Sequence, residues 1–205
     1  MSGEDSHWQA LVDRVKIGLP VVYPTSNLPA LGCIPTSDAL NELFKLKRRG
    51  NDMVVSLAVA DLEQASEIVA VPKQARQLFE DFPPSSLTLI LPALKTLDSR
   101  VGGDSIAIRI ITTEISKKLL KEVGPLTATS ANISKVNPVA DCKEAAEALG
   151  IGPTGFIAGT CSNEPPTTLI QCDDYATLTS GEQLQVIREG MISQMEVNSW
   201  SMKMI

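Results

Sequence analysis

The sequence predicts an α/β fold with one sheet of mixed strand direction and helices flanking it. Short apolar runs rich in β-branched residues alternate with segments whose apolar residues recur at helical spacing. Some runs follow one another closely, as hairpin strands do, so parallel and antiparallel neighbours are both expected. No internal repeat or low-complexity linker is visible, and 205 residues suffice for one well-cored domain.

The first helix is predicted over about residues 6–17, because Leu11, Val12 and Val15 recur at helical spacing. The apolar run that follows predicts a strand over residues 19–23.

The second helix begins after small polar residues at positions 36–38, which are typical of helix N-caps. Leu40, Leu43 and Phe44 share one face of this helix, and Lys47 lies on the same face. The helix therefore presents a basic run at its C-terminal end.

The remaining elements alternate in the same way. One domain is expected over residues 1–193, with a tail over residues 194–205 that forms a short helix or a frayed end. The predicted strands are 54–59, 87–91, 106–110, 126–129, 155–158, 168–171 and 184–188, and the predicted helices are 61–69, 73–80, 115–122 and 143–149.

Composition and charge narrow the class of protein. Hydrophobic residues make up 43% of the chain and charged residues 20%, as in ordinary globular proteins. The net charge of −6 argues against a non-specific nucleic-acid binder, although it is compatible with a local basic patch. The apolar runs are too short to cross a bilayer and the first residues are polar and acidic, so we expect a cytoplasmic protein without membrane contact.

Cysteine and histidine usage argues against several kinds of catalytic site. The four cysteines lack metal-ligand spacing, so buried thiols and no metal site are expected. His7 is the single histidine, which argues against Ser-His-Asp and Cys-His catalysis. Chemistry in this chain must therefore depend on Lys, Arg, hydroxyl, carboxylate and backbone groups.

The stretch YPTSNLPALGC, residues 23–33, follows the first predicted strand. It is rich in hydroxyl and amide groups, with Pro24 and Pro29 at close spacing. Such a loop either turns the chain or presents short polar groups to a ligand. We interpret this one as a substrate-facing loop, in which Thr25 is the principal candidate for substrate contact.

The basic run Lys47-Arg48-Arg49 has two interpretations. Cations at a helix C-terminus complement the helix dipole and can simply form a solvated cap. A lysine beside an arginine is also what a polyphosphate requires, because a point charge and a planar fork together span several oxygens.

Two further segments end predicted strands with polar groups. Ser130 and Asn132 follow one strand, either as a cap and turn or as ligand groups at the edge of an open sheet. Arg109 ends an otherwise apolar strand, where a cation is either paired with a carboxylate or binds an anion, because an unpaired buried charge costs several kcal/mol.

Taken together, the motifs resemble the YrdC family over residues 10–193. Seven short motifs recur in the family's order with similar gaps, and the TSAN stretch and the strand-terminal Arg109 are the most telling. In this sequence they read VVYPTSNLPALGC, LFKLKRRGND, SSLTLILP, DSIAIRI, GPLTATSANIS, PPTTLIQ and VIREGMI.

The resemblance implies a single twisted mixed sheet with a large, concave, positively charged cleft. It also implies the reaction of threonylcarbamoyl-AMP synthesis, in which L-threonine, bicarbonate or CO2, and ATP give threonylcarbamoyl-AMP and pyrophosphate. A second enzyme, a threonylcarbamoyl transferase, then acts on tRNA. Mg²⁺ is expected to travel with ATP.

The resemblance also implies site residues, with positioning and charge stabilisation in place of a catalytic nucleophile. L-Threonine would contact Thr25 and Thr167, with its carboxylate on Arg109. The nucleotide would contact Lys47, Arg49, Ser105 and Arg188, and Ser130 and Asn132 would touch both substrates.

The chain departs from the family pattern mainly in the opening loop. An acidic residue is replaced by Ser26, the following threonine by Asn27, an aromatic residue by Pro29 and a glycine by Ala30. The lysine often found near position 53 is Met53. The anion-binding positions thus match the family better than the loop that shapes the pocket.

Three functional hypotheses follow from these features. The first is a threonylcarbamoyl-AMP synthase. The second is a diverged relative that binds a nucleotide, another amino acid or RNA without this catalysis, and the third is a partner-binding domain.

Overall fold

A single mixed sheet organises the protein, as the sequence predicts. The computed structural model describes residues 3–50, 52–172 and 184–203. Within these ranges eight strands form one sheet in the order β1-β2-β6-β3-β5-β4-β7-β8. The pairs β3–β5 and β4–β7 are parallel and the other neighbours are antiparallel.

The strands and helices have the following bounds. The strands are β1 (Val21–Tyr23), β2 (Ala30–Gly32), β3 (Ser56–Val59), β4 (Leu87–Pro92), β5 (Ser105–Ile110), β6 (Leu126–Ser130), β7 (Thr168–Gln171) and β8 (Val186–Arg188). The helices are α1 (Gly3–Lys16), α2 (Ser37–Lys47), α3 (Leu62–Ser66), α4 (Lys73–Asp81), α5 (Glu114–Val123), α6 (Cys142–Ala148) and α8 (Gln194–Lys203), with short 3₁₀ turns η1 (Ser99–Val101) and η2 (Pro153–Gly155).

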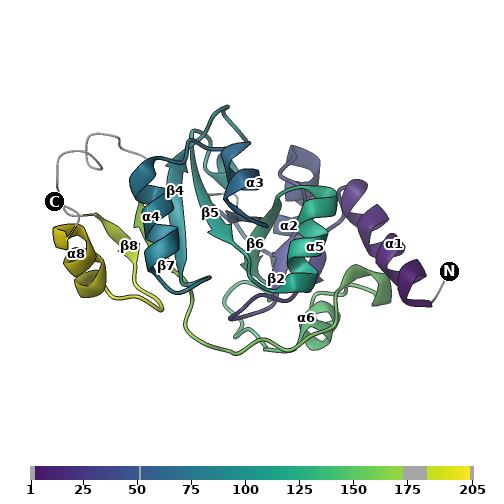
Figure 1. Cartoon of the computed structure of the whole chain (residues 1–205). Helices are drawn as coiled ribbons and strands as arrows, with labels where there is room; N and C mark the ends of the chain where they lie inside the picture. The colour runs from purple at the N-terminus through teal and green to yellow at the C-terminus, as the bar shows by residue number, and fades with distance from the viewer. Residues whose placement is uncertain (1–2, 51, 173–183, 204–205) are drawn as a thin grey trace.

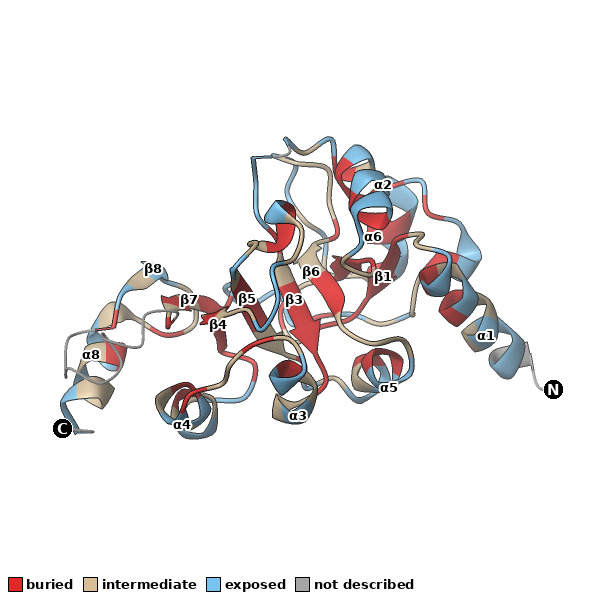
Figure 2. Ribbon diagram, turned by 90° about the horizontal axis from the view of Figure 1, so that it is seen from above, coloured by how far each residue is buried: buried red, intermediate tan, exposed pale blue. Residues whose placement is uncertain are grey.

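The helices are distributed unequally over the sheet. Helices α3, α4 and α5 run along one side of it (Figures 1 and 2), while α2 and α6 lie on the other side near β1. The opposite side of the sheet near β4 and β5 is therefore left to loops.

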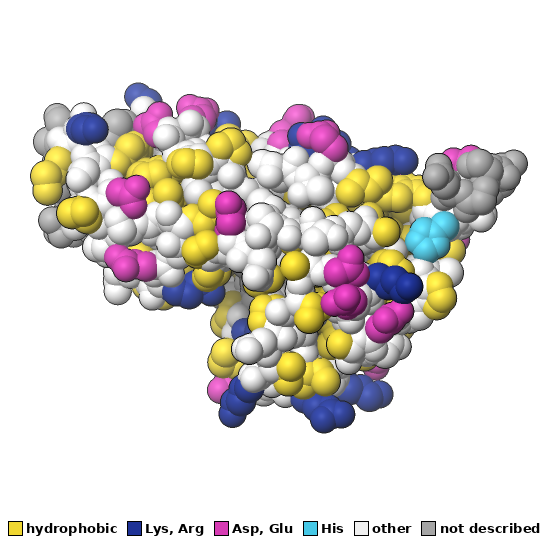
Figure 3. Space-filling model, turned by 90° about the horizontal axis from the view of Figure 1, so that it is seen from below, with side chains coloured by type: hydrophobic (Ala, Val, Ile, Leu, Met, Phe, Trp, Pro, Cys, Tyr) yellow, Lys and Arg dark blue, Asp and Glu magenta, His cyan; other side chains and the backbone are white. Residues whose placement is uncertain are grey.

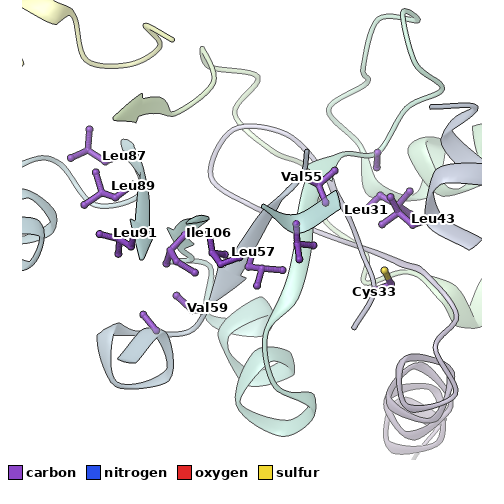
Figure 4. Packing of buried hydrophobic residues seen from close by; sticks show 14 of the residues in the cluster. Leu31, Cys33, Leu43, Val55, Leu57, Val59, Leu87, Leu89, Leu91 and Ile106 are labelled. Carbon is purple, nitrogen blue, oxygen red and sulfur yellow. The ribbon is translucent and has the colours of Figure 1, made fainter. Parts of the chain in front are cut away.

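The core lies between α3, α4 and the buried face of the central strands. Leu57, Leu89, Leu91 and Ile106 have no exposed area and cluster with Leu78 of α4. Figure 4 shows the β4 leucines beside residues of β5 and β3. Burial of each such side chain contributes about 1.5–3 kcal/mol, which fixes the face that each strand turns to the core.

Strand β2 lies within the stretch that the sequence predicts to be a loop. Its pairing with β1 places Val21 opposite Gly32, and its pairing with β6 places Ala30 opposite Ser130. A Cβ atom on Gly32 would come within 2.5 Å of the Tyr23 ring, so only glycine fits this close approach. The polar loop is therefore shorter than expected and lies between β1 and β2.

The predicted strand over residues 155–158 is wrong. Its first residue, Gly155, belongs to the 3₁₀ turn η2, so the segment does not begin in extended backbone. Only an isolated bridge between Val22 and Phe156 follows, with one hydrogen bond from Ile157 N to Val22 O at 2.8 Å.

The C-terminal segment forms helix α8, the first of the two alternatives for it. Val197 has no exposed area, and the Trp200 ring lies 6.2 Å from that of Phe82. Trp200 Nε1 also donates to Asp81 Oδ2 at 2.7 Å, which attaches α8 to the end of α4. The division at residue 193 stays a prediction. None of the described helices combines the length and apolar character that a membrane span requires.

Candidate functional site

The two faces of the central strands differ in exposure. On one face Leu57, Leu89 and Ile108 have no exposed area. Cross-strand register puts the buried apolar residues Ala58, Ala107 and Leu126 on the other face, together with partly exposed residues whose side chains are short, polar or cationic. These are Ser56, Ser105, Arg109, Ala128 and Ser130. Because Ser56, Ser105, Arg109 and Ser130 keep part of their surface exposed, this part of the face can serve as the floor of a polar binding site.

The surface of the molecule is hollowed in more than one place. Figure 3 shows a notch in the outline between the C-terminal end and the rest of the molecule, with Lys and Arg side chains on its margins. A hollow of about 740 Å³ lies elsewhere, between Asp61 and Lys117, and one of about 80 Å³ lies between Leu78 and Thr112. Neither is lined by a predicted site residue.

Lys47 is brought into contact with the end of β6. Its side chain is only 2% exposed. Lys47 Nζ donates to Ser130 O, to Asn132 O at 2.8 Å and to Asn132 Oδ1 at 3.3 Å. Ser130 Oγ donates to the same Asn132 Oδ1 at 2.5 Å. Three predicted residues, which are up to 85 positions apart in the chain, thus form one polar cluster.

Arg49 lies beside this cluster because the chain reverses at the end of α2. Arg48 adopts a left-handed conformation with φ 50°, and Arg49 N donates to Phe44 O at 3.0 Å. The guanidinium then reaches Thr129 Oγ1 at 3.3 Å and Val54 O at 2.9 Å. Its Nε is buried and has no partner within the described residues.

Electrostatics make Lys47 sensitive to alkaline pH. Burial, and to a smaller extent the positive charge of Arg49, lower the pKa of Lys47 to about 8 from an ordinary 10.5. Between pH 8 and 10.5 the Lys47 amine is protonated in the unfolded chain and largely deprotonated in the folded chain. Because the unfolded state binds more protons, the contribution of Lys47 to the free energy of unfolding rises with pH in this window.

Affinity for a triphosphate is expected to fall by up to about tenfold per pH unit above pH 8, because only the protonated lysine attracts phosphate. ATP titrations by calorimetry from pH 7 to 10 measure this, with Lys47→Met as the reference for other titrating groups. Equal pH slopes for the two proteins would contradict the assignment.

Arg109 lies at the other end of the polar face and contacts the loop between β1 and β2. Its Nη2 donates to Ser26 Oγ at 3.0 Å and to Asn27 Oδ1. Burial lowers the pKa of Arg109, and among the described residues no carboxylate lies within ion-pair distance of it. Of the two interpretations of this cation, a structural ion pair is therefore not observed among the described residues, and anion binding stays a prediction.

The same loop joins the two cationic clusters. Near one end Asn27 contacts Arg109, and at the other Ala131 N donates to Pro29 O at 2.8 Å. Ala131 lies between Ser130 and Asn132, which contact the lysine. The cations of α2 and β5 are therefore held around one continuous segment of chain rather than on unrelated surfaces.

The other predicted residues border this region. Thr25 is 4% exposed and its hydroxyl donates to Leu28 O at 2.7 Å. Arg188 Nη2 donates to Thr167 O at 3.0 Å, and the positive charge of Arg188 contributes to lowering the pKa of Arg109. Ser105 begins β5 on the same face as Arg109, paired with Pro92. The roles of all nine predicted residues stay predictions.

Two polar residues near the site are absent from the sequence prediction. Asn27 counts there only as a departure from the family pattern, yet it is 2% exposed and contacts Arg109. Thr88 lies in an apolar strand and shares a 2.6 Å hydrogen bond with the Thr167 hydroxyl. The available signal in the sequence was an amide inside a polar loop next to an apolar strand, because such a group nearly always finds partners when the fold buries it.

The family comparison covers most of the chain. The model of the Sua5/YciO/YrdC family, described as telomere recombination, matches residues 13–190. The threonylcarbamoyl-AMP synthase of Vibrio parahaemolyticus is 27% identical over 192 residues, which cover 90% of this chain and 99% of that protein.

Solved structures show the same fold. E. coli YciO is similar with a TM-score of 0.72 and 25% identity, covering 93% of this chain and 91% of that one. P. abyssi Sua5 complexed with L-threonine has a TM-score of 0.76 at 24% identity, covering 90% of this chain and 54% of the Sua5 chain. This chain thus spans about half the length of that Sua5.

Proposed function

The chain belongs to the Sua5/YciO/YrdC family, and from that premise we propose that it is a threonylcarbamoyl-AMP synthase. The reaction would join L-threonine, bicarbonate and ATP into threonylcarbamoyl-AMP, pyrophosphate and water. The observation that carries the proposal is the placement of Lys47 and Arg109 around one loop on the open face of the sheet.

The proposed chemistry needs binding and orientation more than a covalent nucleophile. The threonine amine forms a carbamate with bicarbonate, and a carbamate oxygen then attacks the α-phosphorus of ATP as pyrophosphate leaves. Arg109 would pair with the threonine carboxylate, while Lys47 and Arg49 would neutralise charge on the phosphates. Fixing both substrates on one floor would supply most of the acceleration.

The remaining predicted residues would complete the substrate contacts. Thr25 and Thr167 would hold threonine, and Ser105 and Arg188 the nucleotide. Ser130 and Asn132 would lie between the substrates, where their hydroxyl and amide groups can both donate and accept.

Magnesium would arrive with ATP rather than occupy a protein site. Among the described residues no group of three or more His, Cys, Asp or Glu side chains could hold a metal ion. Phosphate oxygens and water are the ligands that Mg²⁺ favours in such sites, so bound phosphates would hold it. The product would pass to a threonylcarbamoyl transferase acting on tRNA.

The experiment that tests the function is an assay of pyrophosphate release. Purified protein with ATP, Mg²⁺, bicarbonate and L-threonine is expected to release pyrophosphate only when threonine is present, together with threonylcarbamoyl-AMP detected by mass spectrometry. A known synthase serves as the positive control. If the control is active and this protein releases no pyrophosphate in response to threonine, the synthase proposal is wrong.

One observation favours the second candidate, a diverged relative that binds nucleotide without catalysis. The three donors of Lys47 already have three acceptors, so a phosphate must displace at least one of them. A nucleotide binder would show ATP-induced thermal stabilisation without threonine-dependent release in the same assay.

A further inference from the structure

Asn27 is a buried amide whose four polar contacts join separate parts of the chain. It is 2% exposed. Its Oδ1 accepts from Arg109 Nη2 and from Ser26 Oγ, the latter at 2.6 Å. Its Nδ2 donates to Pro165 O at 2.5 Å and to Met191 Sδ at 3.2 Å. The amide thus bridges β5 to the segments before β7 and after β8.

The chemistry of the partners determines which way the amide points. A guanidinium only donates and a backbone carbonyl only accepts. Rotating the Asn27 amide by half a turn would set its NH₂ against Arg109 and its oxygen against Pro165 O, and both contacts would repel. The oxygen is therefore directed at the guanidinium.

Backbone contacts hold the loop in this position. Ser162 Oγ donates to Ser26 O at 2.6 Å, and Asn163 N donates to Asn27 O at 2.8 Å. Asn27 therefore cannot move without the segment that leads into β7. The loop and this segment together set the position of the Asn27 side-chain oxygen.

The neutral amide of Asn27 affects the charge of Arg109 differently from a carboxylate. An aspartate at this position would form an ion pair with Arg109 and cancel its charge. The amide fixes one nitrogen of the guanidinium and leaves the charge uncompensated. Arg109 Nε is buried and has no partner within the described residues, so the guanidinium keeps an unused hydrogen-bond donor.

We propose that Asn27 is a positioning residue that orients the Arg109 guanidinium for the carboxylate of the amino-acid substrate without neutralising it. The identity of that substrate rests on the proposed function. The other part of the proposal is that Arg109 is an oriented, uncompensated cation able to bind a carboxylate. This part rests on the contacts of Asn27 and Arg109.

The first test separates amino-acid binding from nucleotide binding. Asn27→Asp and Asn27→Ala are each expected to raise the KM for L-threonine about tenfold or more, since charge-assisted hydrogen bonds are the interactions lost, while the KM for ATP changes less than about twofold. Gln9→Glu makes the same amide-to-carboxylate change at an exposed position on α1 and is expected to change neither. Equal increases in both KM values, or no increase, would overturn the proposal.

The second test needs no turnover. Acetate serves as a plain carboxylate, and its binding is followed by the ¹⁵N–¹H signal of Arg109 Nε, assigned by its loss in Arg109→Lys. Acetate is expected to shift this signal saturably in the unmodified protein, about tenfold more weakly in Asn27→Ala, and not at all in Asn27→Asp. No shift in the unmodified protein, or equal affinity in Asn27→Ala, would contradict the positioning role.

The two tests fail in distinguishable ways. If the unmodified protein shows no threonine-dependent release, the proposed function is wrong, and the acetate titration still decides the role of Asn27. If release occurs but acetate affinity is independent of residue 27, the function stands and this inference is wrong.

Discussion

Replacing Arg109 with alanine is expected to lower kcat/KM for L-threonine by about 100- to 1,000-fold. One or two charge-assisted hydrogen bonds to a carboxylate are lost, each of about 1.5–3 kcal/mol, and tenfold in affinity corresponds to about 1.4 kcal/mol. Steady-state pyrophosphate release at several threonine concentrations measures the effect.

The same substitution should leave the fold intact. The two acceptors of Arg109, Ser26 Oγ and Asn27 Oδ1, also contact one another, and the guanidinium has no carboxylate neighbour among the described residues. The loss of these hydrogen bonds is therefore offset by the removal of an uncompensated buried cation. The melting temperature of Arg109→Ala is therefore expected to stay within a few degrees of the original.

Arg76→Ala provides the matched control for Arg109. Arg76 is an exposed arginine on α4, on the side of the sheet away from the polar face. It should keep full activity. Unchanged activity in Arg109→Ala would show that Arg109 does not contribute to the site.

Replacing Lys47 with methionine is expected to weaken both nucleotide binding and the fold. Methionine has nearly the same length but leaves Ser130 O, Asn132 O and Asn132 Oδ1 without the Nζ donor. Buried groups without partners cost about 1–3 kcal/mol, so the free energy of unfolding should fall by about 2–3 kcal/mol and the melting temperature by about 5–10 °C.

Urea unfolding and ATP calorimetry measure the two effects of Lys47→Met separately. Lys45→Met, an exposed lysine on the same helix, is the control and should change neither. A variant that unfolds at the same urea concentration as the original would show that the contacts of Lys47 with β6 do not stabilise the fold. Unchanged ATP affinity would show that Lys47 does not bind the phosphates.

Elements whose signals are local were predictable from the sequence. Helix α2 ends at Lys47, where the apolar periodicity of Leu40 and Leu43 also stops. Strand β5 was expected over residues 106–110 and is observed over Ser105–Ile110, because isoleucine occupies every second position of this segment. Such patterns need no knowledge of distant partners.

Elements that depend on a neighbour were not predictable. Strand β2 has only three residues and exists because β1 and β6 lie on either side of it. The segment at residues 155–158 has strand-like composition but finds only Val22 as a bridge partner. A short segment becomes a strand only where a neighbouring strand offers backbone hydrogen bonds. Local propensity contains no information about that neighbour.

The sequence alone determined the family, the chemical types of the site groups and the cations on which the proposed chemistry depends. Only the tertiary structure decided which groups meet, as in the contact between Asn27 and Arg109 across 82 positions of sequence. The physical reason is that the nature of a side chain is local, whereas its partners, burial and uncompensated charge depend on which segments the sheet brings together.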